Sequence, residues 1–179
     1  GLIAENIVGK PFHEILKEYI FIPLEMEYSS MLHTSNSVKE YSYPIANFSI
    51  DGTVVNDFES FAEIDYAGGG VVATTEDLLK FMQALVNGKI ISEKTLEMMK
   101  NDSNKLYLGI DYGYGIWRLK TIPIFMPKKY KSWGCVGATG SFMFYHPDLD
   151  AYLIGNFNDK SYERKGLRFM LKIIKKLYK

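Results

Sequence analysis

Residues 133–142 read Trp133-Gly134-Cys135-Val136-Gly137-Ala138-Thr139-Gly140-Ser141-Phe142, and this stretch decides the fold. Its glycines remove side chains from one edge of an extended segment, so a ligand can lie against the backbone there. We expect the N–H of Ala138 on this edge to point at a carbonyl oxygen and to stabilise the negative charge that develops there during acyl transfer. The other interpretation is that the glycines only mark a bulge or a twist at the edge of a sheet.

The sequence around this stretch alternates with a period of two residues from Tyr112 onward, which predicts antiparallel strands. The alternation covers Ile116 to Leu119, Ser141 to Tyr145 and Tyr152 to Phe157. Between the last two segments, Pro147-Asp148-Leu149-Asp150 has the composition of a turn and predicts a hairpin. The carboxylates in that turn are expected to make local hydrogen bonds and not to bind a metal ion.

Three segments in the first half of the chain have helical spacing. The first begins at Pro11, which suits a first helical position. The second begins with a hydroxyl cap in Thr74-Thr75 and stops at Gly88, and Ser92 caps a third, shorter helix. Residues 27–66 have no sustained period, so we expect long loops on the surface there.

A fourth helical segment closes the chain. The basic side chains from Arg164 to Lys179 interleave with apolar ones at helical spacing, which predicts an amphipathic helix that docks on the rest of the fold. Its lysines are expected to form a solvated face, with binding to an anionic lipid surface as the open alternative. The predicted fold class is α+β, an antiparallel sheet flanked by helices. We expect one domain over residues 1–179, with helices and loops mainly in 1–105 and antiparallel strands plus the C-terminal helix in 106–179.

Cys135-Val136-Gly137 resembles the third motif of the serine β-lactamases and penicillin-binding proteins, which reads Lys-Thr-Gly, or His-x-Gly in many β-lactamase-related hydrolases. Gly137 matches this motif, and Ala138 matches the position whose backbone N–H helps to form the oxyanion hole of that family. Cys135 departs from it, because a small thiol supplies neither the cation nor the imidazole found there. The resemblance implies that Cys135, Gly137 and Ala138 belong to the catalytic site. It also implies that Thr139 and Ser141 line the substrate strand.

Three other parts of the chain resemble the same family, in the same order along the sequence. They are Gly9-Lys10-Pro11-Phe12 with Ile20-Phe21-Ile22-Pro23-Leu24, then Ala67-Gly68-Gly69-Gly70-Val71-Val72-Ala73-Thr74-Thr75-Glu76-Asp77-Leu78, and then Tyr112-Gly113-Tyr114-Gly115-Ile116-Trp117. The first departs from the family at Glu25, where the turn usually has a glycine. Four matches in order imply a partial β-lactamase/transpeptidase-like fold and the acyl-serine hydrolysis of an amide, an ester or a β-lactam.

The nucleophile motif of that family, Ser-x-x-Lys, occurs nowhere in the chain, and neither does a second motif of the Tyr-x-Asn or Ser-x-Asn type. In the family both motifs lie upstream of the matched segments, and this chain starts with Gly, not Met. We therefore expect the C-terminal portion of a longer hydrolase that is inactive by itself. The alternative is a non-catalytic penicillin-binding or sensor domain that retains the fold, as the missing cation at position 135 suggests.

The resemblance also implies a small-molecule or peptidoglycan-like substrate for the parent protein, and no cofactor. It leaves the compartment open, with an extracytoplasmic or membrane-associated parent as one option. In the family the last strand pairs with strands from the N-terminal part. Residues 151–157 are therefore expected to form an open sheet edge that invites a homo-oligomer.

The composition fits a folded domain, because 47% of the 179 residues are hydrophobic. No apolar run approaches the roughly 20 residues of a membrane span. The net charge is zero, yet residues 1–100 hold 15 acidic and 7 basic side chains while residues 101–179 hold 6 and 14. We interpret this asymmetry as mutual attraction of complementary faces and predict no nucleic-acid partner.

Two other interpretations of the site are weaker. Gly68-Gly69-Gly70 satisfies a relaxed dinucleotide fingerprint, but the preceding acidic segment is a poor match to a buried parallel strand. The only cysteine, Cys135, would be a nucleophile if a base lay nearby, but none of His13, His33 and His146 can be placed beside it from the sequence. The histidines and carboxylates show no spacing typical of a zinc site, so we expect no metal ion.

Overall fold

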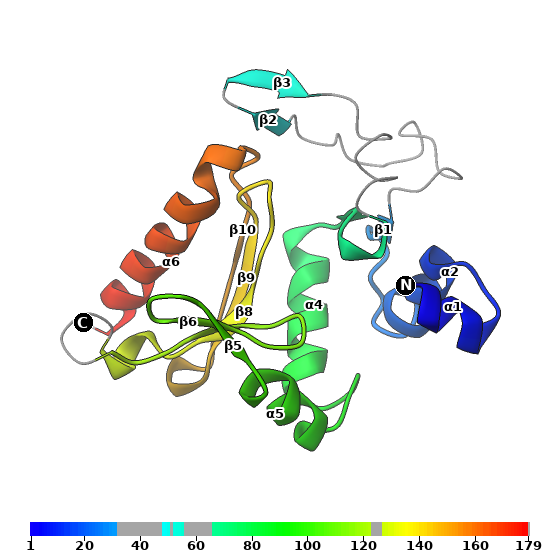
Figure 1. Cartoon of the computed structure of the whole chain (residues 1–179), viewed down its shortest axis with the longest axis horizontal. Coiled ribbons are helices and arrows are strands. Elements are labelled where there is room, and N and C mark those ends of the chain that lie inside the picture. The colour runs from blue at the N-terminus through cyan, green and yellow to red at the C-terminus, as the bar shows by residue number, and fades with distance from the viewer. Residues whose placement is uncertain (32–47, 51, 56–65, 123–126, 179) are drawn as a thin grey trace. The chain divides into compact units, whose positions relative to one another are not determined.

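The alternating residues of the second half do form strands in the computed structural model of the chain (Figure 1). The structure describes residues 1–31, 48–50, 52–55, 66–122 and 127–178. They form two compact units, Gly1–Phe81 and Met82–Lys179. Helices are combined with antiparallel strands, so the predicted α+β class is confirmed. A single domain over residues 1–179 stays a prediction.

The second unit contains a six-stranded antiparallel sheet with the strand order β10-β9-β8-β7-β6-β5. The strands are β5 (Asn104–Tyr107), β6 (Ile110–Tyr112), β7 (Trp117–Leu119), β8 (Trp133–Val136), β9 (Phe142–His146) and β10 (Ala151–Gly155). The three predicted strands are confirmed as β7, β9 and β10, with shifted ends. The predicted turn is also confirmed, because η5 (Pro147–Leu149) and Asp150 in the left-handed region (φ 46°) close the β9–β10 hairpin.

Two strands of this sheet were not predicted, because β5 and β6 carry no clear alternation. Every residue of β5 is exposed, and the register with β6 shifts between Lys105 and Tyr107. A strand that buries no face has no reason to alternate apolar and polar residues. The sheet therefore begins at Asn104, ahead of the expected boundary at residue 106.

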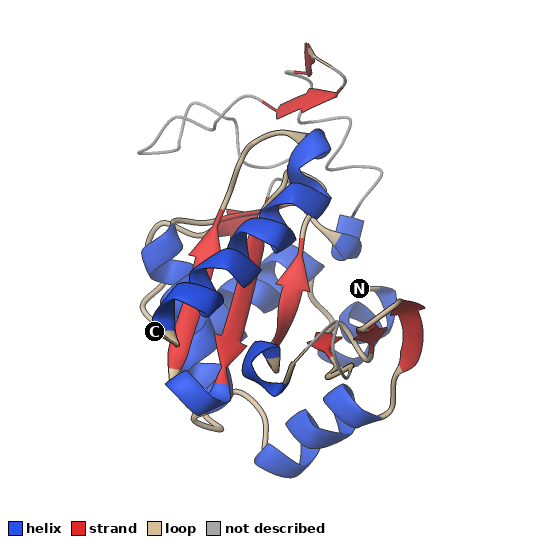
Figure 2. Ribbon diagram, turned by 90° about the vertical axis from the view of Figure 1, so that its left-hand side faces the viewer, coloured by secondary structure: helices blue, strands red, loops and turns tan. Residues whose placement is uncertain are grey.

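Helix α6 (Glu163–Leu177) lies across one face of the sheet, as Figure 2 shows. Its apolar stripe packs on the sheet in one buried cluster, which confirms the predicted docking helix. The cluster contains Ile110, Leu119, Phe142, Phe144, Leu153, Met170 and Ile174. Within the described part of the chain, no helix has both the length and the apolar character needed to cross a bilayer.

The opposite face of the sheet meets helix α5 (Glu93–Asn101). The predicted cap is confirmed, since the Thr95 N–H donates to Ser92 Oγ at 3.1 Å. The ammonium of Lys100 lies 5.1 Å from the ring centroid of Trp133 on β8, a cation–π contact that joins helix and strand. Short 3-10 turns, η4 (Lys128–Tyr130) and η6 (Lys160–Tyr162), precede β8 and α6.

In the first unit, α1 (Leu2–Val8) and α2 (Phe12–Leu16) are joined through Gly9 at φ 73°. The prediction that Pro11 occupies the first helical position is wrong, because it is the N-cap residue and the helix begins at Phe12. The helix then widens into a π turn, η1 (Lys17–Phe21), and ends just before Pro23, which has no N–H to extend it.

The prediction that residues 27–66 are only loops is wrong where these residues are described. Strand β1 (Ser30–Met31) pairs with β4 (Val71–Val72), which follows the turn η3 (Tyr66–Gly68). Strands β2 (Phe48–Ile50) and β3 (Thr53–Val55) form a hairpin with Gly52 at φ 82°. An Asp-Gly pair between β-branched residues is a strong hairpin signal, and it stands in the sequence as Asp51-Gly52. The rest of this prediction lies outside the described residues.

Helix α4 (Thr75–Val86) begins at a buried carboxylate. Thr74 Oγ1 accepts from the Asp77 N–H, as predicted for a hydroxyl cap. Asp77 itself is fully buried and accepts hydrogen bonds from the Tyr28 N–H at 2.8 Å and from Ser29 Oγ at 2.9 Å. One acidic side chain thus ties the start of α4 to the segment that leads into β1.

Candidate functional site

The glycine-containing stretch forms a strand and then a tight turn. Only Trp133–Val136 is extended, so the expectation of an extended edge through Gly140 is wrong beyond Val136. The Gly137 N–H donates to Ser141 O at 2.9 Å and the Gly140 N–H donates to Gly137 O at 3.1 Å. With Gly140 at φ 74°, this is a three-residue hairpin loop that ends in a left-handed glycine.

Two of the glycines are explained by packing and backbone conformation. A Cβ at Gly134 would overlap the carbonyl oxygen of Met143 on β9. Gly140 needs its positive φ, and a Cβ there would lie 2.9 Å from Asp159 O. Close packing inside the sheet accounts for Gly134, and the end of the hairpin loop accounts for Gly140, so neither glycine needs a ligand to explain it.

Ala138 lies at the exposed tip of the same turn. Its N–H has no hydrogen-bond acceptor within the described ranges. Thr139 Oγ1 donates to Ser141 Oγ at 3.2 Å, and that hydroxyl lies against Gly137, where a Cβ would overlap it. The structure therefore brings together four of the five predicted site residues, Gly137, Ala138, Thr139 and Ser141, in one turn.

Strand β8 is open along one edge just before this turn. Strand β7 pairs with β8 only through Arg118 opposite Trp133 and Trp117 opposite Gly134. Backbone groups in a strand point to alternate sides, and the Gly137 N–H points toward β9, so the N–H and C=O of Val136 point toward the β7 side. Beyond Gly134 no residue of β7 reaches them. The open edge of Val136 thus leads directly to the exposed Ala138.

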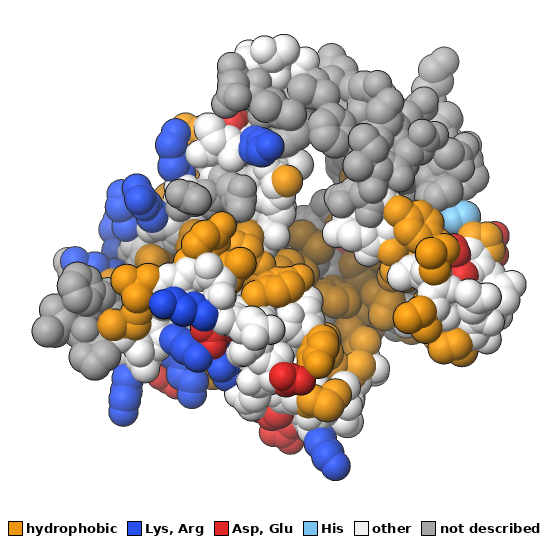
Figure 3. Space-filling model, viewed as in Figure 1, with side chains coloured by type: hydrophobic (Ala, Val, Ile, Leu, Met, Phe, Trp, Pro, Cys, Tyr) orange, Lys and Arg blue, Asp and Glu red, His pale blue; other side chains and the backbone are white. Residues whose placement is uncertain are grey.

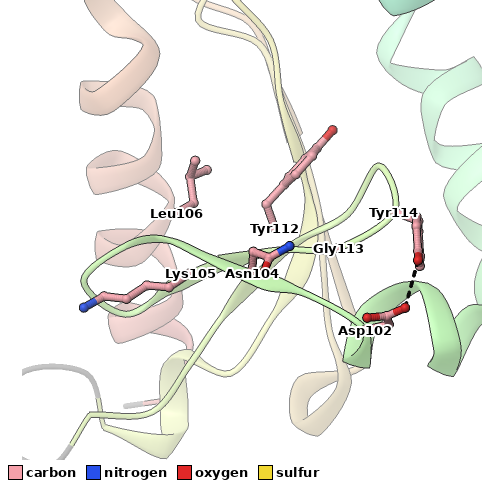
Figure 4. Close-up of a pocket in the computed structure, with 7 residues that line it drawn as sticks. All are labelled: Asp102, Asn104, Lys105, Leu106, Tyr112, Gly113 and Tyr114. Carbon is pink, nitrogen blue, oxygen red and sulfur yellow. Dashed lines mark hydrogen bonds between the residues drawn. The ribbon is translucent and has the colours of Figure 1, made fainter.

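The edge opens where the chain turns between β6 and β7, a turn closed by the Gly113 N–H donating to Ile116 O at 2.8 Å and held against the end of α5. The Tyr114 N–H donates to Met99 O at 3.0 Å, and the Tyr114 hydroxyl donates to Asp102 at 2.8 Å (Figure 4). This hydrogen bond to the Asp102 carboxylate raises the pKa of Tyr114 above its ordinary value. Gly113 also lies against the Met99 carbonyl, where a Cβ would overlap it. Sequence reasoning missed Tyr114 and Asp102, since nothing in their spacing marks them as partners.

Cys135 lies at the beginning of the open edge, but its side chain is largely covered. It faces the same side of the sheet as Met143, its partner on β9. Burial raises the pKa of the thiol to about 11, so it is protonated at neutral pH. His146 lies on the other face of β9, is fully buried, and its Nε2 lies 2.8 Å from Lys129 O. It cannot serve Cys135 as a base, and His33 lies outside the described residues.

Two cavities in the second unit lie away from the turn. One of about 240 Å³ lies beside Tyr112, Tyr114 and Asp102 (Figure 4). The other, of about 620 Å³, lies between α5 and the first half of β8 at Trp133. Neither is lined by residues 135–141. Among the residues that the structure describes, no three His, Cys, Asp or Glu side chains gather as a metal site.

Comparisons with known proteins match nearly the whole chain. A family model described as Beta-lactamase matches residues 1–172. The chain is similar to the putative penicillin-binding protein PbpX of Bacillus subtilis (strain 168), with 27% identity over 113 residues, which are 62% of this chain and 28% of that protein.

Several solved structures share the fold. The D-amino acid amidase from Ochrobactrum anthropi SV3 complexed with L-phenylalanine has a TM-score of 0.73 and 21% identity, over 100% of this chain and 57% of that one. A penicillin binding protein from Bacillus halodurans has a TM-score of 0.71 and 16% identity, over 97% of this chain and 53% of that one. A D-stereospecific amidohydrolase from Streptomyces sp. has a TM-score of 0.68 and 21% identity, over 89% of this chain and 47% of that one. The chain thus spans about half the length of these solved proteins.

Proposed function

This chain belongs to the beta-lactamase family of serine hydrolases, and on that premise we propose that it supplies one wall of an acyl-serine hydrolase site. In this proposal the wall is the end of β8 with the turn that follows it. The reaction is attack of a serine hydroxyl on the carbonyl of an amide, an ester or a β-lactam, followed by hydrolysis of the acyl-enzyme.

The observation that carries the proposal is the exposed N–H of Ala138, which has no acceptor in the described part of the chain. A donor of this kind, aimed at the position where an oxyanion forms, stabilises the transition state more than the ground state. Gly137 keeps the approach free of a side chain. Beside it, Thr139 donates to Ser141 Oγ and orients that hydroxyl, which keeps its own proton to donate to the substrate. The backbone of Val136 offers one further N–H and C=O pair along the same edge.

The attacking hydroxyl and its base must come from polypeptide that this chain does not contain, since Ser-x-x-Lys occurs nowhere in its sequence. We therefore expect the chain alone to be catalytically silent. The purified chain should not turn over nitrocefin, a p-nitrophenyl ester or D-phenylalanine amide above the buffer rate. The amide is included because two of the similar structures are a D-amino acid amidase and a D-stereospecific amidohydrolase. Turnover of any of the three would refute the claim of silence.

The role of Ala138 is tested by removing only its N–H, in a protein that carries this chain together with an upstream Ser-x-x-Lys segment. Ala138 is the first central residue of its turn, a position that accepts proline. Ala138→Pro should therefore retain the fold and lower kcat by about 10²–10³-fold, the usual effect of losing one oxyanion donor. Ala138→Ser keeps the N–H and should retain near-normal kcat. Equal kcat in both variants would remove Ala138 from the mechanism.

A second candidate function is a non-catalytic penicillin-binding or sensor domain. It is favoured by Cys135, a protonated thiol where the family has a cation or an imidazole. Such a protein would retain a fluorescent penicillin without hydrolysing it. The upstream sequence distinguishes the two, because an intact Ser-x-x-Lys favours the enzyme. If Cys135→His in the longer protein leaves the acylation and hydrolysis rates unchanged, position 135 does not limit the reaction.

We also propose self-association through β10. This strand stands at the edge of the sheet in the described residues, with β9 on its other side. An unpaired strand edge presents backbone donors and acceptors to a second chain. A dimer is expected in multi-angle light scattering, and a monomer at high protein concentration would contradict the proposal.

A further inference from the structure

The outward face of α6 carries a continuous basic surface. Five side chains on it are basic and exposed: Lys165, Arg168, Lys172, Lys175 and Lys176. At about 100° per residue they fall within an arc of about 100°, opposite the stripe that packs on the sheet. Figure 3 shows Lys and Arg side chains gathered on this side of the second unit. We call these five residues the α6 basic face.

The charges on this face are not neutralised locally. Within the described residues none of the five pairs with a carboxylate. Lys165 lies 4.5 Å from the ring centroid of Tyr162, a contact that leaves its charge in place. By contrast, the basic residues Lys100 and Arg118 of the same unit do have carboxylate partners, Glu97 and Asp111. The α6 basic face is therefore free to meet an external anionic surface.

Exposed apolar side chains lie beside the same face. Phe169, at 48% exposure, flanks the arc, about 20° beyond Lys176 around the helix. Leu177 and Tyr178 are 53% and 41% exposed at the end of the helix. Cations mixed with half-exposed rings suit a lipid surface, where the charges meet headgroup phosphates and the rings enter the headgroup region. A nucleic acid would use the cations but gain little from these apolar groups.

We propose that the α6 basic face docks the chain peripherally on an anionic lipid surface. The argument is charge complementarity: five unpaired cations within about 17 Å of helix, with an aromatic side chain beside them. The apolar stripe of α6 stays buried in the sheet, so the helix lies on the membrane surface and does not insert into it. This docking does not depend on the proposed hydrolase activity.

The test is co-sedimentation of the whole chain with phosphatidylcholine vesicles, with and without phosphatidylglycerol. Binding is expected only to the phosphatidylglycerol vesicles and should weaken as salt is raised. Each basic residue near the surface contributes about fivefold to the partition constant. The triple variant Lys172→Gln, Lys175→Gln, Lys176→Gln should therefore bind on the order of a hundredfold less tightly. Glutamine keeps the helix, because its helix propensity is close to that of lysine.

The matched control removes the same charge elsewhere in the same unit. Lys89, Lys94 and Lys128 are all exposed and lie outside α6. Their triple glutamine variant should bind nearly as the parent chain does. Phe169→Ala should weaken binding less than the α6 triple variant and leave the salt dependence unchanged, because it removes no charge.

Three outcomes would overturn the proposal. One is absence of binding to the anionic vesicles at low salt. Another is an equal loss in the two triple variants, which would mean diffuse attraction by net charge. The third is binding to a DNA duplex as tight as to the vesicles and unaffected by Phe169→Ala, which would identify a nucleic-acid surface.

Discussion

Strand β8 has a paired neighbour on both sides along its first half and on one side along its second. We call these the closed half and the open half. Trp133 and Gly134 pair with β7 on one side and β9 on the other. Cys135 and Val136 pair with β9 alone among the described residues. A single strand can thus stabilise the sheet at one end and leave backbone groups for a ligand at the other, because the pairing with β7 stops at Gly134, two residues before β8 ends.

The largest effect is expected where the closed half meets the core. Phe144 lies opposite Gly134 on β9 and has no exposed surface. Phe144→Ala should lower the free energy of unfolding by about 3–5 kcal/mol, measured by urea denaturation. Met143 lies opposite Cys135 and is only partly buried, so Met143→Ala should cost less. Equal losses would mean that the two faces of β9 are packed equally well.

The reactivity of the Cys135 thiol tests whether the open half of β8 exposes only backbone groups or side chains as well. With its pKa raised by burial to about 11, Cys135 should react with iodoacetamide at neutral pH on the order of a hundredfold more slowly than a free thiol. The rate should rise as pH approaches that pKa. Rapid labelling at pH 7 would show that the side chain, too, is open.

The row of paired residues Asp111, Arg118 and Trp133 crosses the closed half of β8, and the stability that it contributes should depend on pH. Asp111 on β6 is buried opposite Arg118, itself opposite Trp133. Burial of its carboxyl opposes ionisation, but the hydrogen bonds and charges of Lys120 and Arg118 outweigh it, so the pKa of Asp111 is lowered. Because this pKa is lowered on folding, the stabilisation by ionised Asp111 is complete at pH values above its unfolded-state pKa of about 3.9. It is lost as the pH falls through its folded-state pKa.

Asp111→Asn should therefore lower stability by roughly 1.5–3 kcal/mol at neutral pH. The difference from the parent chain should shrink as the solution is acidified below about pH 4. Urea denaturation at a series of pH values measures this, with Asp148→Asn in the exposed turn as the control. A difference independent of pH would contradict the assignment.

The smallest effect compares one glycine from each half. A Cβ at Gly134 would overlap the backbone of β9, which cannot move without breaking the ladder, so Gly134→Ala should cost about 1–3 kcal/mol. At Gly137 the overlap is with the Ser141 hydroxyl, a side chain that can rotate. Gly137→Ala should cost less, and thermal unfolding of the two variants gives the comparison.

The sequence predicted those elements whose residues alternate against the core or begin with a clear cap. The β9–β10 hairpin, α6 and the Ser92 cap are examples. It did not predict β5, which buries nothing, or the short pairing of β1 with β4, which is too local to produce a pattern.

The candidate site was predicted in composition but not in shape. Resemblance identified Gly137 and Ala138, yet the tight turn depends on Gly140, whose left-handed conformation is needed to close a three-residue loop. The β6–β7 turn beside the open edge is tied to the end of α5 by the Tyr114–Asp102 hydrogen bond, a contact between two chain segments that no local pattern encodes. Asp77 was quoted only as part of a motif, and its complete burial, with hydrogen bonds from the Tyr28 N–H and Ser29 Oγ, became visible in the structure.

The turn that carries Ala138 is supported from behind. Thr139 O accepts the Asp159 N–H at 3.0 Å, and a Cβ at Gly140 would lie 2.9 Å from Asp159 O, so the segment that leads into α6 packs directly against the turn. The amide at the tip is therefore fixed in direction before any reactant arrives, and it would need no reorientation as charge builds on a neighbouring oxygen. Asp159 stands more than twenty residues further along the chain, yet its N–H holds the backbone next to Ala138 and so helps to set the aim of a donor that it never touches.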